Sequence, residues 1–178
     1  MITKNEAEII QSIATALAAD NPNFISDASD LAYELQETFG IDATSGCYRT
    51  AFILDNVVVK VSRNKARAKD LVSEANFIQK MKKDKKFGRH FPKTEVFKVG
   101  NVTLQIQEKV DMSHKGINYI LRYEVEMLGE KLGINDIHSG NYGWKKGKNG
   151  KYPVFVDVDF RNEPSVKRKK KRRSWFVG

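Results

Sequence analysis

The chain has 178 residues, of which 40% are hydrophobic and 30% are charged. This composition is typical of a folded globular protein and excludes a disordered chain, a collagen-like repeat and a small disulfide-stapled fold. The single cysteine, Cys47, cannot form an internal disulfide, so a reducing cytoplasm is the expected location. No apolar run approaches the roughly 18 residues of a membrane-spanning helix, so we expect no membrane span and no signal peptide.

The net charge of +9 is concentrated in one segment. Residues 167–173 read KRKKKRR, and removing these seven charges leaves only about +2 for the rest of the chain. Because a contiguous basic run has no apolar face, we expect residues 164–178 to form a solvated tail that attracts an acidic protein or nucleic acid. Trp175, Phe176 and Val177 follow the run, so anchoring of the tail on the domain stays open as an alternative.

Two helices are expected at the start of the chain. Apolar residues at helical spacing predict a helix over residues 5–19, and the Asn-Pro-Asn sequence that follows ends it. Ser26 or Asp27 can cap a second helix, for which Gly40 is the stop signal. We interpret residues 1–42 as an N-terminal helical extension of the next domain.

A strand pattern begins at Thr44. The segments TSGCYRTAFIL and VVVKVS are rich in β-forming residues, and Asp55-Asn56 between them is a typical two-residue turn. We therefore expect one hairpin with strands over 44–54 and 57–62, opened by a loop of small residues.

The remainder mixes helices with antiparallel hairpins, which predicts the α+β class. Apolar spacing predicts helices over residues 65–83 and 115–132, the second closed by Gly133. The predicted strands are 94–99 with 102–110, and 142–144 with 153–158 across the turn KKGKNG.

Three polar residues follow predicted elements in a pattern that suits phosphoryl transfer. Asp136 and Asn141 lie in DIHSGN, directly after a helix, and Asp157 ends the apolar strand PVFV. Phosphoryl transfer needs a carboxylate that orients the attacking hydroxyl, oxygen ligands for magnesium, and a cation for the ATP phosphates. Asp136, Asn141 and Asp157 can supply the first two.

A cation is available on the strand over 57–62. Strand alternation places Lys60 and Val58 on one face and the other three valines on the opposite face. A buried lysine needs a charge partner, and Glu74 on the next helix is the nearest candidate. Taken singly, each residue also fits an ordinary role, as a lysine reaching solvent, a helix carboxylate in an i,i+4 pair, or a polar turn.

In this combination, residues 44–160 resemble the protein-kinase-like superfamily. That family has a glycine-rich strand-turn-strand, a third-strand Lys, a helix Glu, a catalytic-loop Asp with Asn five positions later, and a metal-binding Asp. DIHSGN is most similar to the D-x-H-x-G-N loop of aminoglycoside phosphotransferase-like kinases and of early protein kinases of T7-like phages. The resemblance implies a small bilobal fold, with an antiparallel N-lobe sheet over about 43–110 and a C-lobe over about 111–163.

The resemblance also implies roles for individual residues. Asp136 would accept the hydroxyl proton, Lys60 would hold the phosphates, Glu74 would orient Lys60, and Asn141 with Asp157 would bind magnesium. The implied ATP-binding set is Ser45, Gly46, Cys47, Val58, Lys60 and the hinge residues Glu108 and Val110. The implied activity is transfer of the γ-phosphoryl group of ATP to Ser or Thr of a protein substrate, in a bacterial host if the likeness to phage kinases extends to location.

The chain departs from the family pattern in three places. The nucleotide loop has one glycine, Gly46, where the family has several. Ile134 and Asn135 stand where relatives have His and Arg, which argues against control by activation-loop phosphorylation. Only 21 residues follow Asp157, so we expect a truncated C-lobe. This expectation favours a protein over a small-molecule substrate, and it leaves a catalytically inactive pseudokinase, used as a binding module, as the alternative.

Three further residues have competing interpretations. His138 has no second histidine at ligand spacing, so we expect it to order its turn by hydrogen bonds. Cys47 has no catalytic His at recognisable spacing and is interpreted as a small loop residue. Asp159-Phe160 resembles the Asp-Phe pair of the family, but Arg161 follows where glycine is expected, so we prefer Asp157 as the metal ligand. The sequence predicts neither the identity of the substrate nor the oligomeric state.

Overall fold

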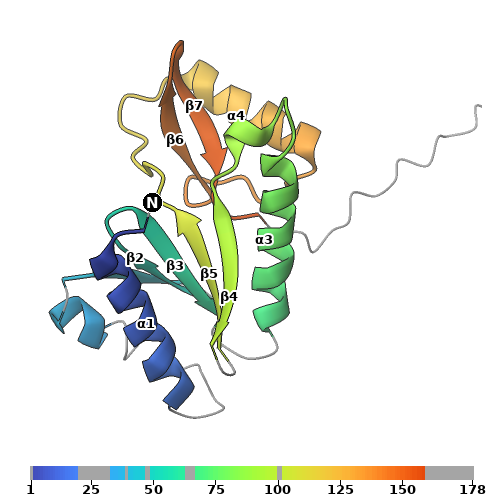
Figure 1. Cartoon of the computed structure of the whole chain (residues 1–178). Helices are drawn as coiled ribbons and strands as arrows, with labels where there is room; N and C mark the ends of the chain where they lie inside the picture. Colours follow the sequence, from blue (N-terminus) through green and yellow to red (C-terminus); the bar gives the residue numbers. More distant parts are fainter. Residues whose placement is uncertain are drawn as a thin grey trace, which may run out of the picture.

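The computed structural model describes residues 2–19, 33–38, 40–46, 49–62, 67–99 and 102–158. These residues form an α+β structure with a five-stranded antiparallel sheet and a separate two-stranded hairpin, which confirms the predicted class (Figure 1). The order of the large sheet is β1-β2-β3-β5-β4, with β1 (Asp42–Ser45), β2 (Arg49–Ile53), β3 (Val57–Ser62), β4 (Thr94–Val99) and β5 (Val102–Glu108).

The first hairpin differs from its prediction. The single strand expected over 44–54 is two strands, β1 and β2, and Ser45 pairs with Thr50 across the reversal between them. The Gly46 N–H donates to the Arg49 carbonyl at 2.9 Å and helps to close this turn. Ser45 and Gly46 thus lie where the chain reverses between β1 and β2, and not in front of a single strand.

The second turn agrees with its prediction. The Leu54 N–H donates to the Val57 carbonyl at 2.9 Å, which closes a hairpin around Asp55-Asn56. This register sets Lys60 opposite Ala51 and Arg49 opposite Ser62. Residues directly opposite in an antiparallel pair share a face of the sheet, so Arg49 and Lys60 lie on the same face.

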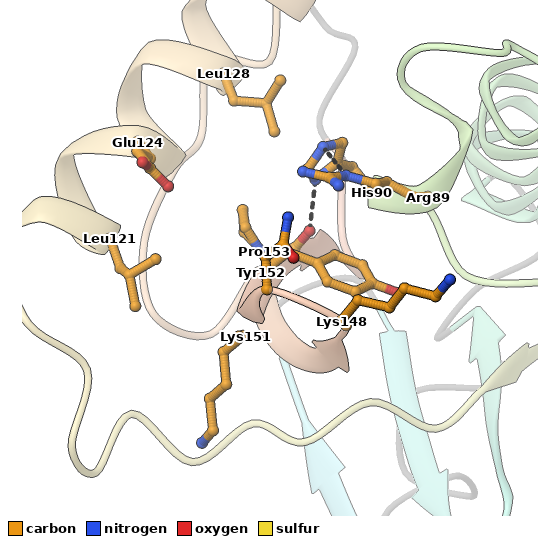
Figure 2. A pocket seen from close by; sticks show the side chains of 12 residues that line it. Arg89, His90, Leu121, Glu124, Leu128, Lys148, Lys151, Tyr152 and Pro153 are labelled. Atoms are coloured by element: carbon orange, nitrogen blue, oxygen red, sulfur yellow. Dashed lines mark hydrogen bonds between the residues drawn. The ribbon is translucent and has the colours of Figure 1, made fainter.

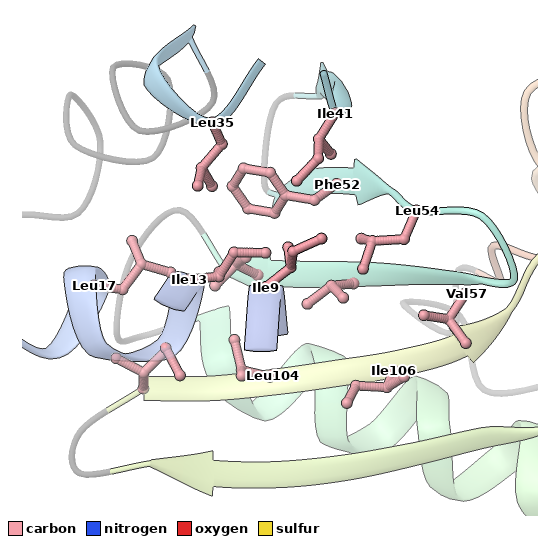
Figure 3. Close-up of a cluster of buried hydrophobic side chains, with 14 residues drawn as sticks. Ile9, Ile13, Leu17, Leu35, Ile41, Phe52, Leu54, Val57, Leu104 and Ile106 are labelled. Atoms are coloured by element: carbon pink, nitrogen blue, oxygen red, sulfur yellow. The ribbon is translucent and has the colours of Figure 1, made fainter. Parts of the chain in front are cut away.

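One face of the sheet is closed by α1 (Lys4–Ala19). Apolar residues of α1 pack with the alternating apolar residues of β3 and β5 in one buried cluster, and Leu35 of the helical segment 33–38 joins them (Figure 3). Its buried members include Ile9, Ile13, Leu17, Phe52, Val57, Val59, Val61, Leu104 and Ile106. The N-terminal helix is therefore part of the core of this sheet.

The start of α1 is tied to the β2–β3 turn through a buried carboxylate. The Thr3 N–H donates to Glu6 Oε2 at 2.8 Å, and the Glu6 N–H donates to Thr3 Oγ1 at 3.2 Å, so the two residues cap the helix reciprocally. The Asn56 N–H also donates to Glu6 Oε1 at 2.6 Å. Glu6 thereby links the first turn of the helix to the hairpin that positions Lys60.

The opposite face of the sheet is covered by α3 (Ala68–Lys82), which lies within the helix predicted over 65–83 (Figure 1). Leu71, Ala75 and Ile78 are buried on this helix, as its apolar spacing predicts. A short 3-10 helix, η2 (Gly88–His90), connects it to β4.

A second buried cluster lies beyond the sheet, between the end of α3, the helix α4 (Tyr119–Leu132) and the hairpin of β6 (Tyr142–Gly147) and β7 (Gly150–Phe155). Ile78, Phe91, Val125, Trp144 and Phe155 are fully or almost fully buried in it. The pairing of Tyr142 with Phe155 and of Trp144 with Pro153 agrees with the predicted hairpin.

Two boundaries in this second half differ from the sequence expectation. The helix α4 begins at Tyr119 and not at residue 115, because the Asn118 side chain accepts a hydrogen bond from the Leu121 N–H at 3.0 Å and caps the helix there. The strands β6 and β7 include residues that were predicted as the turn KKGKNG, so the turn between them is shorter than predicted. Gly133 ends α4 with a φ of 72°, as predicted.

Several expectations lie outside the described residues: the start of the second helix at Ser26 or Asp27, the loop residue Cys47, the alternative ligand Asp159, and the tail over 164–178. Within the residues that the structure does describe, no helix is both long enough and apolar enough to span a membrane.

Candidate functional site

The predicted pair of Lys60 and Glu74 is present and buried between the sheet and α3. Lys60 on β3 and Glu74 on α3 are 5% and 1% exposed, and Lys60 Nζ lies 2.9 Å from Glu74 Oε1. Lys60 Nζ also donates to the carbonyl of Val156, at the end of the β6–β7 hairpin. One ammonium group thus joins three parts of the fold: the sheet, the helix that covers it, and the segment that leads to Asp157.

Arg49 belongs to the same cluster, although the sequence analysis did not select it. Its Nη1 donates to Glu74 Oε2, and its Nη2 lies 3.3 Å from Asp157 Oδ1. The signal that identifies it is the register of the predicted Asp55-Asn56 turn, which places Arg49 on the face of Lys60.

Two glutamines on β5 also belong to the Lys60 cluster, and the sequence did not predict them as site residues. Gln105 lies opposite Lys60, and its Nε2 donates to Glu74 Oε1 at 3.1 Å. Gln107 donates from Nε2 to the Val156 carbonyl at 3.0 Å. Both side chains are almost completely buried, so β5 shows the same alternation as β3, with polar residues toward α3 and apolar ones toward α1.

The charges in this cluster shift the acidities of its two carboxyl groups in opposite directions. Burial by itself would raise the pKa of Glu74, but the adjacent Lys60 and Arg49 cations outweigh it and hold that pKa below its ordinary value. Burial raises the pKa of Asp157 above its ordinary value, against the favourable charge of Lys60, and the nearby Glu74 carboxylate raises it further. The cluster therefore favours the charged form of Glu74 and disfavours the charged form of Asp157.

The segment 136–141 brings the remaining predicted residues to this cluster. Asn141 is buried, and its Nδ2 donates to the Asp136 carbonyl at 2.9 Å. The Asn141 carbonyl accepts hydrogen bonds from the N–H groups of Val156 at 2.9 Å and Asp157 at 3.2 Å. Backbone hydrogen bonds thus hold the predicted catalytic loop beside the predicted metal ligand.

These residues fit a magnesium ion that is shared with phosphate groups. Asn141 Nδ2 is used by Asp136, which leaves Oδ1 without a hydrogen-bond partner among the described residues, and Asp157 supplies a carboxylate. Magnesium prefers oxygen ligands, and it commonly takes one or two from the protein and the others from phosphates and water. In the described parts of the chain, no group of three or more His, Cys, Asp or Glu side chains is placed so that it could hold a metal ion.

Asp136 is placed differently from the other acidic residues. Its side chain is 52% exposed, and His138 Nε2 lies 3.8 Å from its Oδ2. The Asp136 carboxylate is therefore open to solvent, while its main-chain carbonyl is linked to the cluster through Asn141. His138 accepts a hydrogen bond on Nδ1 from the Gly140 N–H at 3.1 Å, so it orders its turn as predicted.

The predicted adenine-binding segment lies at the end of β5. The Glu108 N–H donates to the Lys93 carbonyl and the Lys109 N–H to the Asn56 carbonyl, at 2.8 and 2.9 Å. The N–H of Glu108 is therefore used within the fold and does not serve the predicted contact with adenine. Val58 lies opposite Gln107 on the same face as Lys60, and Ser45 and Gly46 are exposed at the hairpin tip.

A pocket of about 690 Å³ lies elsewhere, between α4, η2 and the β6–β7 turn (Figure 2). Leu121, Leu128 and Glu124 form the α4 side, while Arg89 and Tyr152 lie across from them. None of the predicted site residues lines this pocket. We place the candidate functional site at the Lys60 cluster because buried charged groups are costly to retain.

Comparisons of the chain with protein-family models, with curated proteins and with solved structures find no match. A function for this protein is therefore inferred from its own residues and their geometry.

Proposed function

We propose that this protein is an ATP- and magnesium-dependent phosphotransferase with a small bilobal kinase-like fold, and that it phosphorylates Ser or Thr of a protein substrate. The observation that carries the proposal is the buried Lys60–Glu74 pair, joined through Val156 to the segment that bears Asp157. Burying a lysine costs desolvation free energy unless opposite charges offset it. Binding of phosphates is a function that requires a cation at this position.

Each residue has a role that its position supports. Lys60, held by Glu74, is suited to bind the phosphates. Asn141 and Asp157 would hold magnesium, which when bound supplies positive charge at the phosphate oxygens. Asp136, whose carboxylate is exposed, would orient the substrate hydroxyl and accept its proton.

The two hydrophobic clusters support the bilobal part of the proposal. The first lies between α1 and the sheet, and the second lies between α4, the end of α3 and the β6–β7 hairpin. Lys60 is on the sheet, while Asp136, Asn141 and Asp157 belong to the second half. The candidate site therefore lies where the two halves meet, which is where ligand sites commonly form.

A second candidate function, a pseudokinase that serves as a binding module, is favoured by one specific observation. Lys60 already donates to the Val156 carbonyl, and Arg49 already contacts Asp157, so the phosphate-binding and metal-binding groups are both engaged within the protein. An inactive site stabilised in this way would hold the two halves together without catalysis.

The two candidates are separated by assays on the full chain. The enzyme should bind ATP with magnesium in a calorimetric titration, and it should transfer the γ-phosphoryl group to itself or to a generic protein substrate. Asp136→Ala should retain binding and lose transfer by about 10²-fold or more. Asp42→Ala, which removes an exposed carboxylate on β1, is the matched control and should transfer normally. Binding without any transfer would support the pseudokinase, and the absence of both would reject the phosphotransferase.

A further inference from the structure

Arg49 contacts the same carboxylate, that of Asp157, that a bound metal ion would use. Its guanidinium contacts Glu74 Oε2 with Nη1, and it approaches Asp157 Oδ1 to 3.3 Å with Nη2. One planar cation therefore bridges the helix α3 and the segment after β7. A planar guanidinium is well suited to such a bridge, because its N–H groups diverge in a fixed fork.

The charges of the cluster are balanced in this arrangement. Lys60 and Arg49 face Glu74 and Asp157, which gives two cations and two carboxylates. A divalent cation bound by Asp157 would place two further positive charges beside Arg49 and Lys60. Because the Arg49 and Asp157 side chains are only 23% and 30% exposed, solvent does not fully screen that repulsion.

We propose that Arg49 and a divalent metal ion compete for Asp157. Without nucleotide, Arg49 neutralises Asp157 and disfavours metal binding there. The phosphates of a nucleotide bring negative charge that Arg49 can bind instead, so release of Arg49 from Asp157 couples metal binding to nucleotide binding. The competition rests on the proposed function only in taking Asp157 as the metal ligand, whereas its coupling to nucleotide also takes Lys60 as a phosphate-binding residue.

The position of Arg49 makes this exchange possible. It is the first residue of β2, next to the predicted phosphate loop, and lies two positions along the strand from Ala51, the partner of Lys60. A side chain at this site can turn from Asp157 toward phosphates held by Lys60 while its backbone stays paired with Ser62 in the sheet. Because linked equilibria are reciprocal, the two ligands strengthen each other equally. If nucleotide raises the affinity for the metal by some factor, the metal raises the affinity for nucleotide by the same factor.

The test measures binding of Mn²⁺ by electron paramagnetic resonance, with Mn²⁺ as the probe for a divalent ion. Without nucleotide, Arg49→Gln should bind Mn²⁺ roughly tenfold more tightly than wild type, since one positive charge next to the ligand is removed. Arg49→Lys keeps the charge and should stay close to wild type. Arg122→Gln, which removes an exposed arginine on α4, is the control for net charge and should not change the affinity.

Two further measurements make the result decisive. The increase in Mn²⁺ affinity caused by Arg49→Gln should be absent when Asp157→Asn is also present. In the second measurement, a non-hydrolysable ATP analogue should increase the Mn²⁺ affinity of wild type more than that of Arg49→Gln. Thermal melting checks that each variant is folded. If Arg49→Gln binds Mn²⁺ no better than wild type, or if neither protein binds it, the competition is rejected. Failure of wild type to bind the ATP analogue, with the Mn²⁺ gain intact, would reject the phosphotransferase and leave the competition standing.

Discussion

The backbone N–H of Asp157 donates to the carbonyl oxygen of Asn141 at 3.2 Å. This bond joins the two residues that the sequence predicts as metal ligands, one from the loop after α4 and the other from the end of the hairpin. A hydrogen bond between their main chains holds the two residues next to each other independently of any ligand. The candidate metal site is thus built into the fold of the second half of the molecule.

Removal of Lys60 should strongly destabilise the protein. Lys60→Met leaves the buried Glu74 with less compensation, and breaking a buried ion pair in this way costs about 3–5 kcal/mol of the free energy of unfolding. Arg49 and Gln105, which also contact Glu74, place the expected loss toward the lower end of that range. Urea unfolding followed by circular dichroism measures it.

The matched control for this prediction is Lys4→Met. Lys4 lies 4.0 Å from Glu8, and both side chains are largely exposed, so the loss should be below about 1 kcal/mol. Equal losses in the two variants would contradict a structural role for the buried pair.

The choice of Asp157 over Asp159 as metal ligand is tested by comparing their amides. Asp157→Asn should weaken magnesium-dependent nucleotide binding more than Asp159→Asn does, because the Asp157 main chain is bonded to Asn141 and its side chain joins the Lys60 cluster. Calorimetric titration of ATP with and without magnesium gives the comparison. A larger effect of Asp159→Asn would reverse the assignment.

The sequence predicts the helices and strands that carry the site better than it predicts the complete set of site residues. The two-residue turn at Asp55-Asn56 and the alternation of β3 correctly place Lys60 on the face of α3, because turn chemistry and strand periodicity are local properties. The strand pattern alone did not predict the split of residues 44–54 into β1 and β2, since one glycine in a run of strand-forming residues is a weak turn signal. The family resemblance, by contrast, implied a strand-turn-strand around Ser45 and Gly46.

Arg49, Gln105 and Gln107 were missed for a different reason. Each is an ordinary polar residue in a strand, and its burial depends on α3 and the Val156 segment, which are distant in sequence. The same limit applies to Glu6, whose burial depends on contact of α1 with the β2–β3 turn. Local patterns predict which residues share a face, but not which face a later element will cover.

Glu6 should contribute a pH-dependent part of the stability. Burial would raise its pKa, but hydrogen bonds from Thr3 and Asn56 outweigh this effect and hold the pKa below the ordinary 4.5. A carboxyl group whose pKa is lowered by folding stabilises the protein above the unfolded-state pKa, and this stabilisation is lost as the pH falls through the folded-state pKa. Glu6→Gln should therefore cost about 1–3 kcal/mol near neutral pH and progressively less below about pH 4.5.

Urea unfolding of wild type and Glu6→Gln between pH 3 and pH 7 tests this prediction. Glu8→Gln is the control, because Glu8 is an exposed carboxylate on the same helix, and it should change stability little at any pH. A wild-type advantage that grows toward low pH would contradict the assigned direction of the Glu6 pKa.

The basic tail should add binding without contributing to chemistry. Seven contiguous cations over 167–173 attract phosphates or carboxylates independently of sequence, and none of them is a general base near neutral pH. If the tail binds nucleic acid, affinity should fall linearly with the logarithm of salt concentration, with a slope of up to about −0.9 per neutralised phosphate. A chain that lacks residues 167–178 should lose most of that slope, because the rest of the protein carries little net charge.

The same truncated chain tests whether the tail belongs to the fold. If the tail only binds other molecules and does not pack on the domain, its removal should change neither the melting temperature nor ATP turnover. Trp175, Phe176 and Val177 are apolar, so if they pack on the domain their loss exposes the surface they cover and lowers the melting temperature by several degrees, about 2–4 °C per kcal/mol for a protein of this size. Such a decrease, or the loss of turnover, would show that the tail is structural, whereas an unchanged melting temperature with a reduced salt slope is the outcome we expect.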